Sequence, residues 1–256
     1  MQPVGQAYRG APLVMLDEVD STNSEAQRRA AAGERGPLWI CARSQSQGRG
    51  RSGRSWGSPR GSLAATLLFC PASDPWRLPE LALVAGVATA ETLAGLLLPA
   101  AKPSLRIKWP NDVLIANAKV SGILVESARY GVEQVAMIGV GINIAAAPVV
   151  PERAVTSLAE HGVDTTPDDL AVALSDALAA HLAIWNHGQG FAAIRSLWLE
   201  RAEPLGAAIS VNAGAGPVSG TFAGLDMDGA LLLKDGMGRQ LRFTFGDVTH
   251  VRPTKA

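Results

Sequence analysis

Short apolar runs rich in Val, Ile and Leu alternate along this chain with longer stretches rich in Ala and Leu, and polar or glycine-containing segments separate them. The short runs predict strands and the longer stretches predict helices. Strands are expected at residues 13–16, 38–43, 62–70, 105–109, 113–115, 121–127 and 134–144. Helices are expected at residues 24–32, 78–98, 167–187 and 190–202. Because successive strands follow one another between residues 105 and 144, the pattern favours an antiparallel or mixed sheet over regular strand–helix alternation.

The pattern changes after Pro204. Short apolar runs separated by glycine-containing turns predict strands at residues 209–211, 218–225, 230–234, 240–244 and 248–252. A segment of this kind is typical of a small β-barrel. We therefore predict an α+β protein, in which residues 1–203 form a mixed sheet with flanking helices and residues 204–256 form the barrel.

Composition and charge narrow the classes of partner. The 256 residues are 47% hydrophobic and 18% charged, and 23 basic residues balance 23 acidic ones, so an ordered domain without bulk attraction to nucleic acid is expected. The apolar stretch 78–101 is interrupted by Glu80 and Glu91, which predicts a buried helix and no membrane span. Cys41 and Cys70 lie in predicted apolar strands, which favours buried free thiols over a disulfide. Free thiols fit a reducing compartment. We therefore predict a cytoplasmic protein without a signal peptide.

The most unusual segment is residues 45–56, which we call the Arg-Gly loop. It contains arginines at positions 49, 51 and 54 and glycines at positions 48, 50 and 53. Arginines this close repel one another unless an anion binds them, and glycines let a backbone approach a ligand closely. The loop therefore predicts a clamp for phosphate and carboxylate groups. The alternative is a solvated surface loop.

Two familiar motifs match the same segment. Residues 48–53 match the dinucleotide fingerprint G-x-G-x-x-G, and residues 53–57 match the nucleophile elbow G-x-S-x-G. Both motifs require a helix directly afterwards, and the following Trp, Gly and Pro residues disfavour one. A dinucleotide site is therefore rejected. A serine hydrolase using Ser55 stays open as an alternative, because four histidines leave a catalytic partner available.

Polar residues also interrupt three of the predicted strands. Lys108 precedes Trp109 in an apolar strand, where an unpaired ammonium is costly. Lys119 begins another strand, and Gly122 within that strand suggests that a ligand approaches the backbone. Asn143 lies among glycines in a third strand, and a buried amide there could pair with an adenine edge.

Five segments in this order resemble the biotin protein ligases. They are residues 20–23 (Asp-Ser-Thr-Asn), 48–56, 108–112 (Lys-Trp-Pro-Asn-Asp), 119–126 and 139–144. The resemblance implies a class II synthetase-like catalytic domain followed by an SH3-like barrel. It also implies that the biotin carboxylate attacks the α-phosphate of ATP to give biotinyl-5'-AMP and pyrophosphate. A lysine of a biotin carboxyl carrier protein then attacks the anhydride, which releases AMP. ATP and biotin would be substrates, with Mg²⁺ carried by ATP.

The resemblance also implies roles for individual residues. Catalytic roles fall to three basic residues, Lys119, Arg51 and Lys108. The residues implied to bind biotin are Ser21, Thr22, Asn23, Gln45, Gly48, Arg49, Arg51, Trp56, Lys119 and Gly122. The residues implied to bind ATP are Arg49, Arg51, Arg54, Lys108, Asn111, Asp112, Lys119 and Asn143. Asp112 would position either the acceptor amine or a cation. No metal-ligand cluster is expected, because the His, Cys, Asp and Glu residues lack the required spacing.

The nearest alternative is a lipoate ligase, which shares the adenylation chemistry but uses another acid. Few residues precede the first predicted strand, too few for a helix-turn-helix domain, so we expect no DNA binding. Ser121 stands where the family commonly has a small apolar residue. Exposed sheet edges would permit a homodimer.

Overall fold

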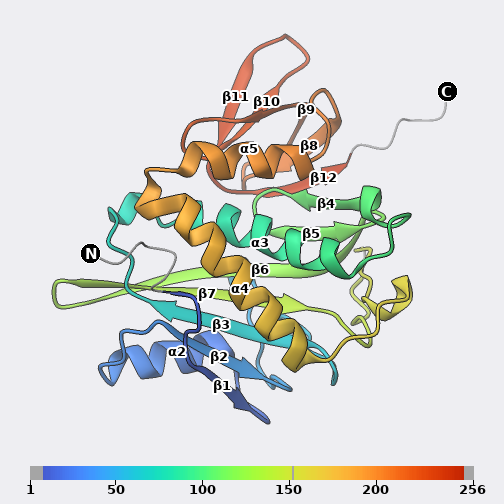
Figure 1. Cartoon of the computed structure of the whole chain (residues 1–256). Coiled ribbons are helices and arrows are strands. Elements are labelled where there is room, and N and C mark those ends of the chain that lie inside the picture. Colours follow the sequence, from blue (N-terminus) through green and yellow to red (C-terminus); the bar gives the residue numbers. More distant parts are fainter. Residues whose placement is uncertain (1–7, 152, 251–256) are drawn as a thin grey trace.

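A seven-stranded mixed sheet forms the centre of the protein (Figure 1). We describe it from a computed structural model, which describes residues 8–151 and 153–250. The strands are β1 (Leu13–Leu16), β2 (Leu38–Ala42), β3 (Leu63–Phe69), β4 (Leu105–Lys108), β5 (Asp112–Ile115), β6 (Ala118–Tyr130) and β7 (Glu133–Ile142). Their order is β1-β2-β3-β7-β6-β5-β4, and only the β1–β2 pairing is parallel among the strands described. The predicted mixed sheet is confirmed.

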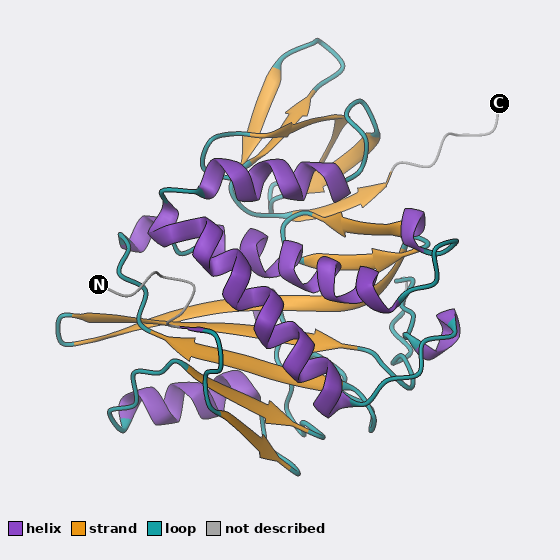
Figure 2. Ribbon diagram, viewed as in Figure 1, coloured by secondary structure: helices purple, strands orange, loops and turns teal. Residues whose placement is uncertain are grey.

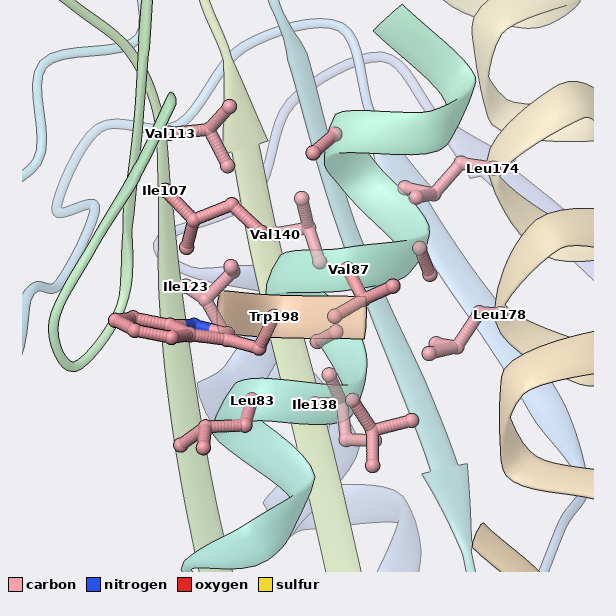
Figure 3. Close-up of a cluster of buried hydrophobic side chains, with 14 of the residues drawn as sticks. Leu83, Val87, Ile107, Val113, Ile123, Ile138, Val140, Leu174, Leu178 and Trp198 are labelled. Carbon is pink, nitrogen blue, oxygen red and sulfur yellow. The ribbon is translucent and has the colours of Figure 1, made fainter. Parts of the chain in front are cut away.

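Helices cover both faces of this sheet (Figure 2). On one face lie α3 (Glu80–Leu96), α4 (Pro167–Trp185) and α5 (Phe191–Arg201), and on the other lies α2 (Thr22–Ala31). Figure 3 shows α3 in the middle of the larger core, surrounded by side chains from the sheet, α4 and α5. Alternate residues of β7 serve the two faces: Ile138 packs in this core, whereas Met137 packs beneath α2.

Helix α3 has the composition of a membrane span but the surroundings of a core helix. The segment Pro75–Leu96 is long and apolar enough to cross a membrane, yet 72% of its most apolar window is buried inside the protein. The predicted buried helix is thus observed. Of the two cysteines, Cys41 is buried as expected, but Cys70 is partly exposed at the end of β3, where the strand reaches the surface.

The C-terminal part is a separate five-stranded antiparallel sheet. Its strands are β8 (Ala208–Asn212), β9 (Pro217–Leu225), β10 (Leu231–Lys234), β11 (Gln240–Phe243) and β12 (Asp247–His250), in the order β11-β10-β9-β8-β12. The predicted all-β unit is confirmed, although the last two residues of its final predicted strand lie outside the described residues. It packs beside α5 and β4 (Figure 1), where the Trp109 indole donates a hydrogen bond to the Gly229 carbonyl at 3.0 Å. The domain boundary near residue 204 stays a prediction.

The Arg-Gly loop contains no α-helix. Its one regular element is a 3₁₀ turn, Arg51–Gly53, in which Ser52 has a left-handed backbone (φ 56°). The chain then runs without helix to β3. Both the dinucleotide motif and the nucleophile elbow lack the helix that they require, as the sequence predicted.

Substitution by alanine should change the free energy of unfolding differently at two buried serines. Ser121 lies between β5 and β7, and its hydroxyl has no hydrogen-bond partner in the described part of the chain. Ser121→Ala should leave the free energy of unfolding unchanged or raise it by about 1 kcal/mol, because an unsatisfied buried hydroxyl is removed.

The matched control is Ser157→Ala. The Ser157 hydroxyl is also buried but donates to the Glu160 carboxylate at 2.9 Å, so its loss should lower the free energy of unfolding by about 1 kcal/mol. Urea denaturation of both variants measures the difference. A clear destabilisation by Ser121→Ala would contradict the structure.

Candidate functional site

A cleft of about 1170 Å³ opens on the same face of the sheet as α2. The Arg-Gly loop, the segment after β7 and strand β12 surround it. Fourteen of the predicted site residues line this cleft: Ser21, Thr22, Asn23, Gln45, Arg49, Arg51, Arg54, Trp56, Lys108, Asn111, Asp112, Lys119, Gly122 and Asn143. The remaining one, Gly48, does not line it. The cleft therefore brings together predicted site residues that lie as far apart in the sequence as Ser21 and Asn143.

Three glycines of β6 and β7 form the floor of the cleft. A Cβ atom at Gly141 would lie 2.5 Å from the Trp56 indole, and one at Gly122 would lie 2.9 Å from the same ring. A Cβ atom at Gly139 would overlap the Asn23 side chain. The sequence predicted that a ligand approaches Gly122, and in the structure the Trp56 ring lies against this glycine. The indole Nε1 of Trp56 is buried without a hydrogen-bond partner among the described residues.

A hydrogen-bond network ties the start of the Arg-Gly loop to the sheet. The Gln45 amide oxygen accepts hydrogen bonds from the Thr22 backbone at 2.8 Å and from the Thr22 hydroxyl at 3.2 Å. On β3, the Thr66 hydroxyl lies 2.7 Å from the Asn23 amide oxygen, and the Asn23 amide nitrogen donates to the Leu124 carbonyl at 3.3 Å. The Gln45 amide nitrogen donates to the Ser58 hydroxyl at 3.1 Å, so the amides of Asn23 and Gln45 are both bound to the protein at the edge of the cleft. Thr66 was not among the predicted site residues, and its signal in the sequence was a hydroxyl in an apolar strand.

Asp112 joins the two predicted catalytic lysines. Its carboxylate lies 3.1 Å from the Lys108 ammonium and 2.5 Å from the Lys119 ammonium. Burial by itself would raise the pKa of Asp112, but the two ammonium groups outweigh burial and hold that pKa below its ordinary value. Burial also lowers the pKa of Lys119, against the opposing effect of Asp112. Asp112 thus pairs with two lysines, and the cost expected of an unpaired Lys108 is avoided. Its role toward a substrate stays a prediction.

The middle of the Arg-Gly loop is bound to the C-terminal sheet. Arg54 makes a bidentate ion pair with Asp247 at 2.8 and 2.9 Å. Arg51 donates to the Asn111 amide oxygen at 3.0 Å and to the Gly246 carbonyl at 3.5 Å, and burial lowers its pKa. Asp247 was not among the predicted site residues, and the signal in the sequence was an acidic residue directly after Gly246.

Asn143 offers an unused acceptor inside the cleft wall. Its amide nitrogen donates to the Thr156 carbonyl at 3.0 Å. Its amide oxygen is buried and accepts no hydrogen bond from the described residues. Buried acceptors are normally paired, so this oxygen is suited to an amino donor on a bound ligand.

The charge of the cleft is predominantly positive. Six cationic side chains line it: Arg49, Arg51, Arg54, Lys108, Lys119 and Arg153. Three carboxylates, Asp112, Glu126 and Asp247, pair with four of them. Arg51 contributes to this excess because its partners are neutral. Arg153, which was not among the predicted site residues, comes from the segment after β7. An excess of positive charge in a concave site favours an anionic ligand.

Neither a metal centre nor a hydrolase triad is supported. Within residues 8–151 and 153–250, no group of three His, Cys, Asp or Glu residues could hold a metal ion. Ser55 lines the cleft, but none of the histidines whose side chains the structure describes lines it.

Asp112→Asn should destabilise the fold because it leaves two ammonium groups without their anion. We expect the free energy of unfolding at pH 7 to fall by about 2 kcal/mol, less than for a fully buried pair because all three side chains are partly solvated. Since the pKa of Asp112 is lowered on folding, its contribution is present above about pH 4 and is lost as the pH falls further. Urea denaturation from pH 7 to pH 3 should show the two proteins converging in acid.

Asp168→Asn is the control for this substitution. Asp168 pairs with Arg43 at 2.9 Å, but both side chains are half exposed, so little change is expected. Equal effects of the two substitutions would contradict the special position of Asp112.

Comparisons with known proteins agree with this geometry. Residues 17–143 match the Biotin/lipoate A/B protein ligase family, and residues 205–251 match the Biotin protein ligase C terminal domain. The Biotin–[acetyl-CoA-carboxylase] ligase of Paracoccus denitrificans is 40% identical over 89% of this chain and 96% of its own length. The Bifunctional ligase/repressor BirA of Escherichia coli is 32% identical over 88% of this chain and 70% of its own length.

Solved structures give the same result. The biotin protein ligase from Aquifex aeolicus in complex with biotin and ATP is 26% identical, with a TM-score of 0.79, over 94% of this chain and 99% of that chain. The extent of these matches, together with the cleft that unites the five sequence segments, establishes that the chain belongs to the biotin protein ligase family.

Proposed function

We propose that this protein activates biotin with ATP to form biotinyl-5'-AMP and then transfers the biotinyl group to a lysine of a biotin carboxyl carrier domain. The observation that carries the proposal is the cationic cleft, in which all but one of the residues predicted for these substrates lie together. A relative supports it, since the Paracoccus denitrificans protein is a Biotin–[acetyl-CoA-carboxylase] ligase. A related structure from Leishmania major, 26% identical with a TM-score of 0.61, is in complex with biotinyl-5-AMP.

The first step joins two anions that repel each other. The cations of the cleft reduce this repulsion, and their effect is strong because the site is partly shielded from water. Lys119 is the best placed for charge that develops at the α-phosphate. Its ammonium lies between the Asp112 carboxylate and the Trp56 ring, 5.2 Å from the ring centroid. Arg51 and Lys108 lie at the same end of the cleft, as partners of Asn111 and Asp112.

The nucleotide would bind further polar groups of the cleft. The free amide oxygen of Asn143 can accept a hydrogen bond from the adenine amino group. The Arg-Gly loop, held by Asp247, can cover the reacting groups and keep water from the anhydride. Trp56 can pack against the apolar part of biotin, because its ring already lies on the glycine floor.

Biotin is the preferred acid over lipoate. The family model for residues 17–143 includes both kinds of ligase. The C-terminal match to a biotin protein ligase domain and the Paracoccus denitrificans relative favour biotin. Further proposals follow from the family and the composition. We propose that Mg²⁺ is bound with ATP, that the protein is cytoplasmic and can form a homodimer, and that it binds neither DNA nor membranes.

Isotope exchange between pyrophosphate and ATP tests the proposed acid. We expect exchange with biotin, and transfer of the biotinyl group to a purified biotin carboxyl carrier domain, because the adenylate is the common intermediate. Lipoate should support at most weak exchange. Exchange with lipoate alone would rule out the biotin assignment.

Lys119→Ala should impair adenylation more than biotin binding. If the ammonium stabilises charge that develops in the transition state, the exchange rate should fall by roughly a hundredfold or more, whereas the Kd for biotin should change by less than about tenfold. Calorimetry and the exchange assay measure the two quantities. Lys102→Ala, an exposed lysine that does not line the cleft, is the matched control. Equal losses of binding and exchange would instead assign Lys119 to ground-state binding.

A further inference from the structure

Glu126 on β6 connects two walls of the cleft through a single oxygen atom. Its Oε2 accepts a hydrogen bond from the Asn23 amide nitrogen at 2.8 Å and also forms a short ion pair with the Arg49 guanidinium. Asn23 belongs to α2 and Arg49 to the Arg-Gly loop, so these three residues come from three different elements. Neither the residue patterns nor the family resemblance assigned a role to Glu126.

The two partners of Glu126 differ in how firmly they are held. Asn23 is only 3% exposed and is also bound to the Leu124 carbonyl and the Thr66 hydroxyl. Arg49 lies between two glycines, and its backbone pairs only with Ser55 in an isolated bridge. In the described part of the chain, Glu126 is the one side chain that binds the Arg49 guanidinium. Glu126 thus links Arg49, which has few other contacts, to Asn23, which the sheet holds firmly.

This contact leaves most of the guanidinium available. Only Nη2 of Arg49 is engaged, while a guanidinium carries five N–H donors arranged in a rigid plane. Fixing one end of the plane orients the remaining edge, and Arg49 lines the cleft. An arginine whose direction is fixed in advance loses less conformational entropy when it binds a carboxylate.

We propose that Glu126 is a positioning residue, which orients Arg49 so that its free edge binds the substrate carboxylate. The inference rests on the proposed function, because it takes Arg49 to bind the acid. Glu126 does not contact the reacting atoms itself. Its effect should therefore reach the substrate through Arg49 and appear in binding of the acid more than in the chemical step.

Glu126→Ala and Glu126→Gln test this role in the full-length protein. In biotin-dependent exchange, Glu126→Ala should raise the KM for biotin by about fivefold or more and change kcat by less than about twofold. Glu126→Gln keeps an acceptor oxygen for Asn23 and Arg49, so it should recover most of the loss. Calorimetric titration with biotin should show the same order of affinities without relying on turnover.

Two controls separate positioning from a general structural effect. Glu133→Ala removes a comparable pair, Glu133 with Arg35 at 2.7 Å on the neighbouring strand, away from the cleft, and should leave the KM for biotin unchanged. The double variant Arg49→Ala with Glu126→Ala should bind biotin no more weakly than Arg49→Ala alone, because the effect of Glu126 passes through Arg49.

Three outcomes would overturn the inference: an unchanged KM for biotin in Glu126→Ala, a lower KM, which would show that Glu126 competes with the substrate, or additive losses in the double variant. Failure of the proposed function is distinguishable from these outcomes, because the unmodified protein would then show no biotin-dependent exchange at all.

Discussion

Repulsion among cations is the constraint on which the organisation of the cleft depends. Six positively charged side chains line one cleft, and they can remain together without a substrate only if internal anions pair with them. Asp112, Glu126 and Asp247 supply these anions from β5, β6 and β12. Each carboxylate holds a cation that comes from a different segment of the chain. Charge balance in the cleft therefore depends on the complete sheet and on the C-terminal unit.

The sheet provides the surface on which this balance is built. Its α3 face is filled by apolar side chains, whereas its α2 face is only partly covered by a helix. Beyond α2, the glycines at positions 122, 139 and 141 leave the β6–β7 surface low enough for Trp56 and Asn23 to lie against it. Side chains larger than hydrogen at these positions would displace the groups that frame the cleft. The same glycines thus serve packing in the free protein and access for a ligand.

Much of the fold could be predicted from the sequence because local patterns determine it. Apolar periodicity located the strands and helices, and the lack of helices between residues 105 and 144 indicated the mixed sheet. The main error was the length of β6, predicted as residues 121–127 but extending over Ala118–Tyr130. Ala118 and Lys119 extend the strand because they pair with β5, and residues 128–130 extend it because they pair with β7. Pairing with another strand cannot be inferred from the pattern of a single segment.

The site was predictable only in part, for the same physical reason. Arginines among glycines and a lysine in an apolar strand are locally costly, so they can be recognised from the sequence. Their partners are not locally unusual: Glu126 ends an apolar run, and Asp247 lies in a tail strand. Only the fold brings Glu126 to Arg49 and Asp247 to Arg54.

The internal ion pairs also bear on how binding energy can be used. A substrate anion that enters the cleft meets cations whose direction is already set, so less side-chain entropy is lost on binding. It must, however, share these cations with the protein carboxylates, which limits the gain in affinity for the ground state. Interactions that strengthen only as charge builds up between carboxylate and phosphate are not reduced in this way, and such interactions accelerate the reaction. We therefore expect moderate ground-state binding and strong transition-state stabilisation from one feature, the pairing of four cleft cations with carboxylates of the protein.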